Sequence, residues 1–161
     1  MNLNYTRYIS HIDNKFDISK PLWFQERWTL KFKNCNKTIG GLYYLVYSDT
    51  NHGGRVNKNE CLKEPLTNRY LYSNGCVKDS VNDKSKYVLL SKEYGVTKVD
   101  VSCYRGSGLG YISFGYDGKV YSYLGNNPKE ITTPCKINLY DKHNNMATII
   151  IEPKTGYIYK N

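Results

Sequence analysis

The last third of the chain consists of short segments with alternating polar and apolar residues, separated by residues that favour tight turns. Asp117-Gly118 lies between two such runs, at 112–116 and 119–123, and predicts a β-hairpin closed by a type I′ turn. Further runs follow at 135–140 and 147–151, and the second of them turns through a Pro- and Gly-containing segment into the C-terminal tyrosines. This spacing predicts an antiparallel meander of short strands.

Five cysteines at wide, irregular spacing favour disulfides over a metal site. None forms a Cys-x-x-Cys pair, and the three histidines have no zinc-ligand spacing from them. Such a pattern is typical of an oxidising compartment, and no metal or other cofactor is expected. The expected bridges are Cys103–Cys135, which encloses the predicted hairpin, and Cys61–Cys76. Cys35 is then left over, either as a buried thiol or as an intermolecular partner.

The first two thirds of the chain add one helix and several strands. Residues 3–13 have apolar side chains at spacings of three and four, which predicts the end of an amphipathic helix. Residues 27–33 alternate as a half-buried strand, and residues 42–47 pair back on it. Short strands are also predicted at 87–90 and 96–103. Together with the meander, these elements predict an α+β fold, with a helix packed on an antiparallel, disulfide-stapled sheet.

Composition limits the size and the partners of the protein. At 161 residues the chain is expected to be a single domain, 1–161. Its 23 Lys and Arg residues against 14 acids give a formal charge of +9, which favours polyanion partners, with a solubilising surface as the alternative. Tyrosine is unusually frequent, at 17 residues. It suits a half-buried sheet, and a stacking platform for ligands is the alternative.

Catalytic and phosphate-loop motifs do not stand out in the sequence, so an enzyme is not expected. The glycine-rich segment 106–110 lacks the lysine and the following helix of a phosphate-binding loop. Residues 49–60 follow the register of a twelve-residue calcium loop, with Asp49 first and Glu60 last, but Gly53 replaces one ligand. An ordinary loop is therefore the preferred interpretation of this segment.

Cations alternate along the predicted strand 27–33. Arg27, Lys31 and Lys33 fall on one side of the strand, and Lys37 follows in the next turn. Long cationic side chains on a rigid element suit sequence-independent contacts to phosphates. These four residues are the candidate DNA-binding residues, and a solvated face that deters edge-to-edge aggregation is the alternative.

Two stretches of the chain resemble the periplasmic domains of type IV pilin-like proteins (pseudopilins) of epsilon-class proteobacteria. The first is YTRYISHIDNKFD at 5–17, with Trp-Phe and Arg-Trp pairs behind it. The second comprises ISFGYDGKVY at 112–121, CKINL at 135–139 and IIIEPKTGYI at 149–158. The closing Ile-Glu-Pro-x-Thr-Gly-Tyr segment is the most specific part, and residues 49–102 are much less diagnostic.

The resemblance implies a minor pilin or pseudopilin of a type IV pilus, a type II secretion system or a DNA-uptake machine for natural transformation. Such proteins carry a long N-terminal helix, whose apolar first half lies in the inner membrane and later in the filament core. That half and the prepilin cleavage motif are absent here, so residues 3–13 are expected to be the end of the helix. The full-length protein is then anchored in the inner membrane, with a periplasmic or cell-surface domain.

The partners implied by the resemblance are other pilins of the filament and, given the cationic strand, double-stranded DNA. A function from another class is a small secreted carbohydrate- or lipid-binding protein that uses exposed tyrosines.

Overall fold

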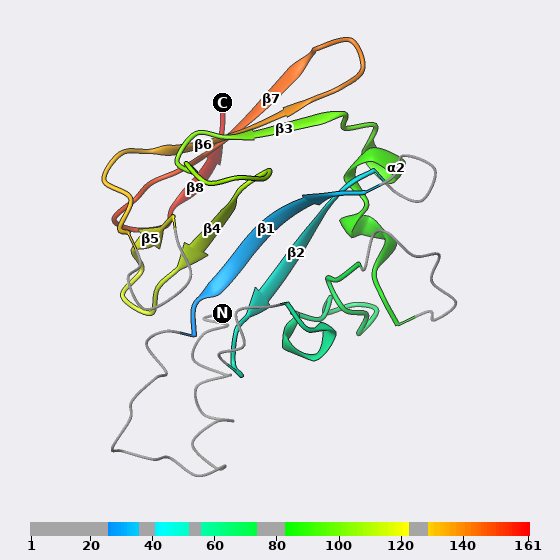
Figure 1. Ribbon diagram of the computed structural model, residues 1–161, viewed down its shortest axis with the longest axis horizontal. Coiled ribbons are helices and arrows are strands. Elements are labelled where there is room, and N and C mark those ends of the chain that lie inside the picture. The colour runs from blue at the N-terminus through cyan, green and yellow to red at the C-terminus, as the bar shows by residue number, and fades with distance from the viewer. Residues whose placement is uncertain (1–25, 36–40, 52–55, 74–82, 123–128) are drawn as a thin grey trace.

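The computed structural model describes residues 26–35, 41–51, 56–73, 83–122 and 129–161, and this part of the chain is mostly β. Its strands form two four-stranded antiparallel sheets, with the orders β2-β1-β4-β5 and β3-β6-β7-β8 (Figure 1). The strands are β1 (Trp28–Asn34), β2 (Leu42–Ser48), β3 (Lys98–Val101), β4 (Tyr111–Phe114), β5 (Val120–Tyr121), β6 (Cys135–Tyr140), β7 (Met146–Ile151) and β8 (Ile158–Lys160). Helical structure in the described residues is limited to α2 (Leu90–Tyr94) and the 3-10 turns η2 (Lys58–Glu60) and η3 (Lys86–Val88).

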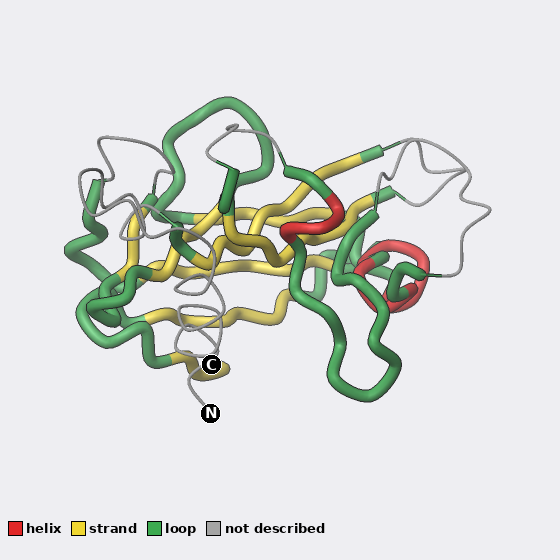
Figure 2. Tube along the Cα trace, turned by 90° about the horizontal axis from the view of Figure 1, so that it is seen from below, coloured by secondary structure: helices red, strands yellow, loops and turns green. Residues whose placement is uncertain are grey.

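The two sheets share one apolar core, because each strand buries alternate side chains. Phe32 and Ile112 contribute to it from the first sheet, Ile137 and Ile151 from the second, and Leu90 from α2. In a view turned by 90°, the strands lie together in the middle of the molecule and loops surround them (Figure 2). The main core therefore lies between the sheets, and it leaves the opposite face of the first sheet for other contacts.

The Cys103–Cys135 disulfide is confirmed, across a sequence separation of 32 residues. Cys103 follows β3 and Cys135 begins β6, so the bridge links two neighbouring strands of the second sheet at the point where the chain leaves for β4 and β5. Cys135 is fully buried. By loop-closure entropy a bridge of this span stabilises the fold by about 3.5–4 kcal/mol.

The predicted strands at 27–33 and 42–47 are confirmed as β1 and β2, and the hairpin around Asp117-Gly118 as β4 and β5. The hairpin turn is not type I′, because Gly118 has φ +77° while Asp117 does not have a positive φ. The Lys119 carbonyl accepts the Gly115 N–H at 2.9 Å, which closes a longer turn.

The single C-terminal meander was a wrong prediction. The β4–β5 hairpin joins β1 in the first sheet, whereas β6, β7 and β8 form most of the second. The alternating pattern shows which face of a strand is buried, but it does not say which strand lies beside it.

Residues 87–90 are not a strand. They lie in η3 and at the start of α2, where Val88 and Leu90 are buried and Gly95 closes the helix at φ +69°. A short apolar run is compatible with either a strand or a buried helical turn, and here the left-handed glycine ends a helix.

The predicted Cys61–Cys76 bridge is also wrong. Cys61 carries a buried thiol, whose Sγ donates a hydrogen bond to the backbone carbonyl of Asn57 at 3.5 Å. Cys35, expected to be left over, is disulfide-bonded, and Cys76 lies outside the described residues. The spacing of cysteines along a chain cannot determine their pairing, because it does not specify which strands become neighbours.

The predicted helix at 3–13 also lies outside the described residues. Among the residues that are described, no helix has the length and apolar character needed to span a membrane.

Candidate nucleic-acid interface

Two of the candidate cations, Lys31 and Lys33, lie on the face of the first sheet that points away from the main core; we refer to it as the outer face. Leu30 and Phe32 point to the core, so Thr29, Lys31 and Lys33 alternate to the outer face. The antiparallel register places neighbours from adjacent strands beside them. The aligned sets are Thr29 with Tyr47 and Ser113, Lys31 with Leu45 and Tyr111, and Lys33 with Tyr43.

Arg27 is buried, with 7% of its surface exposed, which corrects its prediction as an exposed DNA-binding residue. Its guanidinium carbon lies 4.4 Å from the centre of the Tyr121 ring, a cation–π contact at the end of the sheet. Nε and Nη1 of Arg27 are buried without a hydrogen-bond partner. The side chain therefore faces the protein interior beside β5 and not the solvent, where a phosphate backbone could reach it.

Lys31 and Lys33 remain on the outer face and are the candidate residues best placed for an anion. Lys33 is exposed, and the Lys31 Nζ lies 5.7 Å from the centre of the Tyr111 ring. Burial lowers the pKa of Lys31, and repulsion from the Lys33 ammonium lowers it further. Neither lysine forms an ion pair within the described part of the chain. Lys37 lies outside the described residues.

Strand alternation predicts a solvent-exposed outer face, but part of this face is buried. Thr29 and Ser113 are completely buried, and their hydroxyl groups hydrogen-bond each other at 2.9 Å across β1 and β4. Buried hydroxyls need such a partner, because desolvation without a hydrogen bond is costly. The part of the outer face around Thr29 and Ser113 is therefore buried from solvent. Lys31 and Lys33 lie further along β1, toward its C-terminal end.

A second apolar cluster covers another part of the outer face. Tyr43, Leu45 and Tyr47 of β2 form it together with Cys61. Burial strongly raises the pKa of Tyr47, which marks a phenol held away from water. Residues 56–73 supply three of the side chains that pack on this cluster, Val56, Tyr70 and Tyr72; the others are Cys35 and Leu89.

Lysines lie over the rings of these covering tyrosines, and the sequence analysis missed them. The Tyr70 ring centre is 5.5 Å from the Lys58 Nζ and 4.7 Å from the Lys63 Nζ. The Lys84 Nζ lies 5.5 Å from the Tyr72 ring centre. The abundance of tyrosine in the sequence was a signal for such lysine–tyrosine contacts. The lysine and the tyrosine of each contact are too far apart in sequence for a strand pattern to connect them.

Glu60, the last residue of the calcium-like segment, already uses both carboxylate oxygens within the protein. Oε1 accepts hydrogen bonds from the Asn51 N–H at 3.0 Å and the Thr50 hydroxyl at 3.3 Å. Oε2 accepts bonds from the backbone and side-chain nitrogens of Asn57, at 3.2 and 3.1 Å. This arrangement favours the ordinary-loop interpretation, although residues 52–55 lie outside the description. No group of three or more His, Cys, Asp or Glu side chains in the described ranges is arranged to hold a metal ion.

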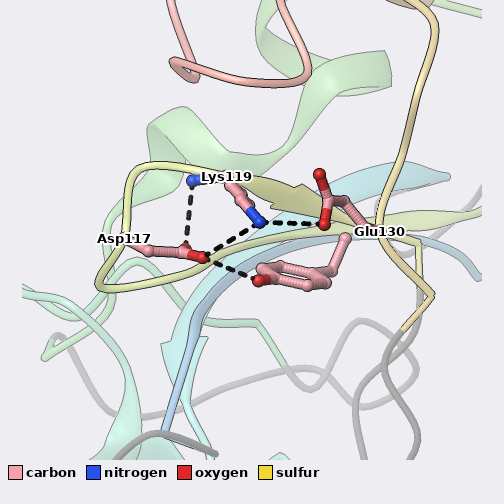
Figure 3. A network of polar contacts seen from close by, with 4 residues as sticks. Asp117, Lys119 and Glu130 are labelled. Atoms are coloured by element: carbon pink, nitrogen blue, oxygen red, sulfur yellow. Dashed lines mark hydrogen bonds and ion pairs between the residues drawn. The ribbon is translucent and has the colours of Figure 1, made fainter.

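A network of one ammonium, two carboxylates and one phenol braces the β4–β5 turn (Figure 3). Asp117 accepts the Lys119 N–H at 3.2 Å and the Tyr121 hydroxyl at 3.0 Å, while the Lys119 Nζ donates to Glu130 at 3.1 Å. The bond to Glu130 raises the pKa of Lys119, as expected for an ammonium beside carboxylates. The network therefore links the turn residue Asp117 to Lys119 and Tyr121, and links Lys119 to Glu130.

Comparisons with known proteins found no match to a family model, to a curated protein or to a solved structure.

Proposed function

We propose that this chain is the extracytoplasmic domain of a minor pilin or pseudopilin, serving a type IV pilus, a type II secretion system or a DNA-uptake machine, and that it binds double-stranded DNA. The sequence resemblance at 112–121, 135–139 and 149–158 supports the family. A mostly β domain with a Cys103–Cys135 disulfide is compatible with a periplasmic or cell-surface position.

In this proposal, residues 3–13 end the long helix of a pilin-like α+β fold, and the rest of that helix anchors the full-length protein in the inner membrane. The globular domain then faces the periplasm, where it contacts other pilins of the filament and DNA. Assembly rather than catalysis is the function.

The observation that carries DNA binding is the pair of ammonium groups on Lys31 and Lys33. They lie two residues apart on the same face, burial and then the Lys33 ammonium lower the pKa of Lys31, and no described carboxylate forms an ion pair with either lysine. Like charges placed side by side repel each other, and a phosphate between them relieves that cost. Contacts of this kind hold a phosphate backbone without reading bases.

A gel shift with duplex DNA at low salt tests this proposal. The wild-type protein should retard the duplex, and Lys31→Ala/Lys33→Ala should weaken the retardation. Lys136→Ala/Lys142→Ala is the matched control, because it removes the same charge from exposed positions in and after β6. Absence of retardation by the wild type, or equal retardation by both variants, would contradict the proposed face.

Co-sedimentation tests the filament part of the proposal. A tagged full-length protein should sediment with filaments sheared from its own cells, and loss of its gene should reduce secretion or DNA uptake. A protein found solely in the culture medium, with both processes intact, would argue for a different class.

Exposed tyrosines favour a second candidate, the small secreted carbohydrate- or lipid-binding protein. Tyr116, Tyr157 and Tyr159 are exposed, and the rings of the last two are stacked at 5.9 Å. Such rings can pack against sugars or acyl chains. Intrinsic fluorescence titrated with glycans, lipid vesicles and DNA separates the two candidates, since a response to DNA alone excludes this one.

A further inference from the structure

The sequence contains one Asp-Gly pair, and it lies in the turn between β4 and β5. Asp117 is exposed, and Gly118 has φ +77°, a conformation that glycine adopts without strain. A Cβ built on Gly118 would meet a single atom within 4 Å, the Thr155 carbonyl oxygen at 3.9 Å. Neither a side chain at 118 nor close packing therefore separates the Gly118 nitrogen from the Asp117 carboxyl group.

The Asp117 side chain folds back over this peptide unit. Its Oδ1 accepts the Lys119 N–H at 3.2 Å, a bond that turns the carboxyl group along the chain toward the following residues (Figure 3). Gly115 leaves the space that this arrangement needs, because a Cβ there would collide with Asp117 Oδ1 and would lie 2.7 Å from Tyr121 Cε2. The carboxyl group is thus held close to the backbone of the Asp-Gly bond.

A carboxyl group in this position can react with the next backbone nitrogen. The Gly118 nitrogen bonds to the carboxyl carbon of Asp117 and loses its proton, while one carboxyl oxygen leaves as water, and a succinimide ring results. Water then opens the ring. Opening at the main-chain carbonyl of Asp117 leaves the chain connected through the side chain, as isoaspartate. The product has the same atoms as the starting protein, because the water released in the first step is taken up in the second.

The contacts around Asp117 oppose this reaction. Its Oδ2 accepts the Tyr121 hydroxyl at 3.0 Å, and the Lys119 Nζ lies 4.0 Å from the same oxygen. These contacts hold the carboxylate oxygens, one of which must leave for the ring to form. The reacting nitrogen is also engaged, since the Gly118 N–H donates to the Gly115 carbonyl at 3.2 Å.

We propose that Asp117 is a site of isoaspartate formation in the folded protein, and that the hydrogen bonds of Tyr121 and Gly118 limit its rate. The proposal does not depend on the function proposed above. Its reactants are one side chain, the adjoining peptide nitrogen and water.

The modification acts on the junction between the two sheets. The Val120 N–H donates to the Pro153 carbonyl at 2.9 Å. A Cβ built on Gly156 would lie 3.2 Å from the Gly118 carbonyl oxygen, so the β4–β5 and β7–β8 turns lie against each other. Isoaspartate adds one carbon to the backbone at residue 117 and shifts this contact. We expect the isomer to melt about 2–4 °C below the unmodified protein, which is the effect of about one lost hydrogen bond in a chain of this length.

Peptide mapping of the aged protein tests the proposal. After incubation at neutral pH, trypsin releases residues 106–119 as one peptide, which separates isoaspartate at 117 from products of the Asn74-Gly75 pair elsewhere in the chain. The isomer has the mass of the parent peptide, a different retention time and resistance to a protease that cleaves before aspartate. It should accumulate in the folded wild type, and faster in the urea-unfolded chain, which lacks these contacts.

Tyr121→Phe isolates the contribution of the phenol. The variant keeps the ring that lies 4.4 Å from the Arg27 guanidinium carbon and removes the hydrogen bond to Asp117, so the isomer should form about fivefold faster. Tyr159→Phe is the matched control, because it removes a phenol–carboxylate bond of similar length, 3.1 Å to Glu152, and should leave the rate unchanged. Thermal melts check that both variants are folded at the incubation temperature.

The rate of isomer formation at Asp117 decides the proposal. Absence of the isomer in the folded wild type, or a rate equal to that of the unfolded chain, overturns it. An unchanged or slower rate in Tyr121→Phe also overturns it, because the phenol then does not restrain the reaction. An equal rise in Tyr159→Phe indicates general loosening of the fold and has the same consequence. If Tyr121→Phe does not fold, the wild-type rates with and without urea still decide.

Discussion

Glu60 organises the connection between β2 and the covering segment 56–73, and replacing it should destabilise the protein clearly. The side chain is buried, with 5% of its surface exposed. Its carboxylate accepts bonds from the Asn51 N–H, the Thr50 hydroxyl, and the backbone and side chain of Asn57. Glu60→Ala removes all of these acceptors at once.

The magnitude follows from the donors that lose their partner. Each buried donor left without an acceptor costs about 1–3 kcal/mol, and the backbone N–H groups of Asn51 and Asn57 cannot move away. These two residues are exposed, so water reaches part of the site and reduces the cost. We expect Glu60→Ala to lower the free energy of unfolding by about 2–3 kcal/mol, which is roughly 4–12 °C in melting temperature for a chain of this size. Glu60→Gln keeps one acceptor oxygen and should lose about half as much.

Urea unfolding followed by intrinsic fluorescence, with thermal melts beside it, measures these changes. Glu130→Ala is the control, since Glu130 is exposed and its pair with Lys119 contributes at most about 1 kcal/mol. Calcium should leave the wild-type melting temperature unchanged. A Glu60→Ala stability within about 0.5 kcal/mol of the wild type would refute the reasoning, and a calcium-induced rise that this variant abolishes would support the calcium-loop interpretation instead.

Three further predictions concern the disulfide, the buried hydroxyl pair and Lys31. Cys103→Ala/Cys135→Ala should lose about 3.5–4 kcal/mol in urea unfolding, and a loss below about 1 kcal/mol would show that the closed loop matters little. A double-mutant cycle of Thr29→Val and Ser113→Ala should give a coupling energy of about 1 kcal/mol, and additive losses would argue against their hydrogen bond. The folded pKa of Lys31 lies below its unfolded value of 10.5, so its ammonium costs stability at neutral pH and this cost fades as pH rises toward 10.5. Thermal melts should therefore find Lys31→Gln more stable than the wild type near neutral pH, with an advantage that disappears toward alkaline pH; a constant difference would contradict the desolvation argument.

Local patterns predicted the local elements well. Alternation placed β1 and β2 correctly, and the Asp117-Gly118 signal placed the β4–β5 hairpin, because both features act between residues near in sequence. The Cys103–Cys135 bridge was also predictable, since it encloses that hairpin.

Features that depend on neighbours distant in sequence were not predictable in this way. Arg27 has the alternation of an exposed cation, yet Tyr121, far along the chain, lies against it. Cys61 keeps a buried thiol in the apolar cluster beside Tyr47. A single sequence describes the faces of a strand, whereas burial and pairing depend on which strand becomes its neighbour.

The candidate interface shows the same limit. Lys31 and Lys33 were identified from one strand, but the contacts of Lys63 with the Tyr70 ring and of Lys84 with the Tyr72 ring join separate segments of the chain. Their tyrosine partners were noticed solely as an excess in composition. The physical signal, an ammonium group over an aromatic ring, exists only once the chain has folded.

The Cys103–Cys135 bridge also determines how the domain responds to tension. If the chain is pulled from its ends, the segment that this bridge encloses cannot lengthen. At about 3.4 Å per extended residue, the 32-residue separation shortens the extensible contour length of the chain by roughly 110 Å. The folded chain held under load would thus keep its β4–β5 hairpin out of the force path, and breaking the bridge would appear in single-molecule stretching as an added release of that length.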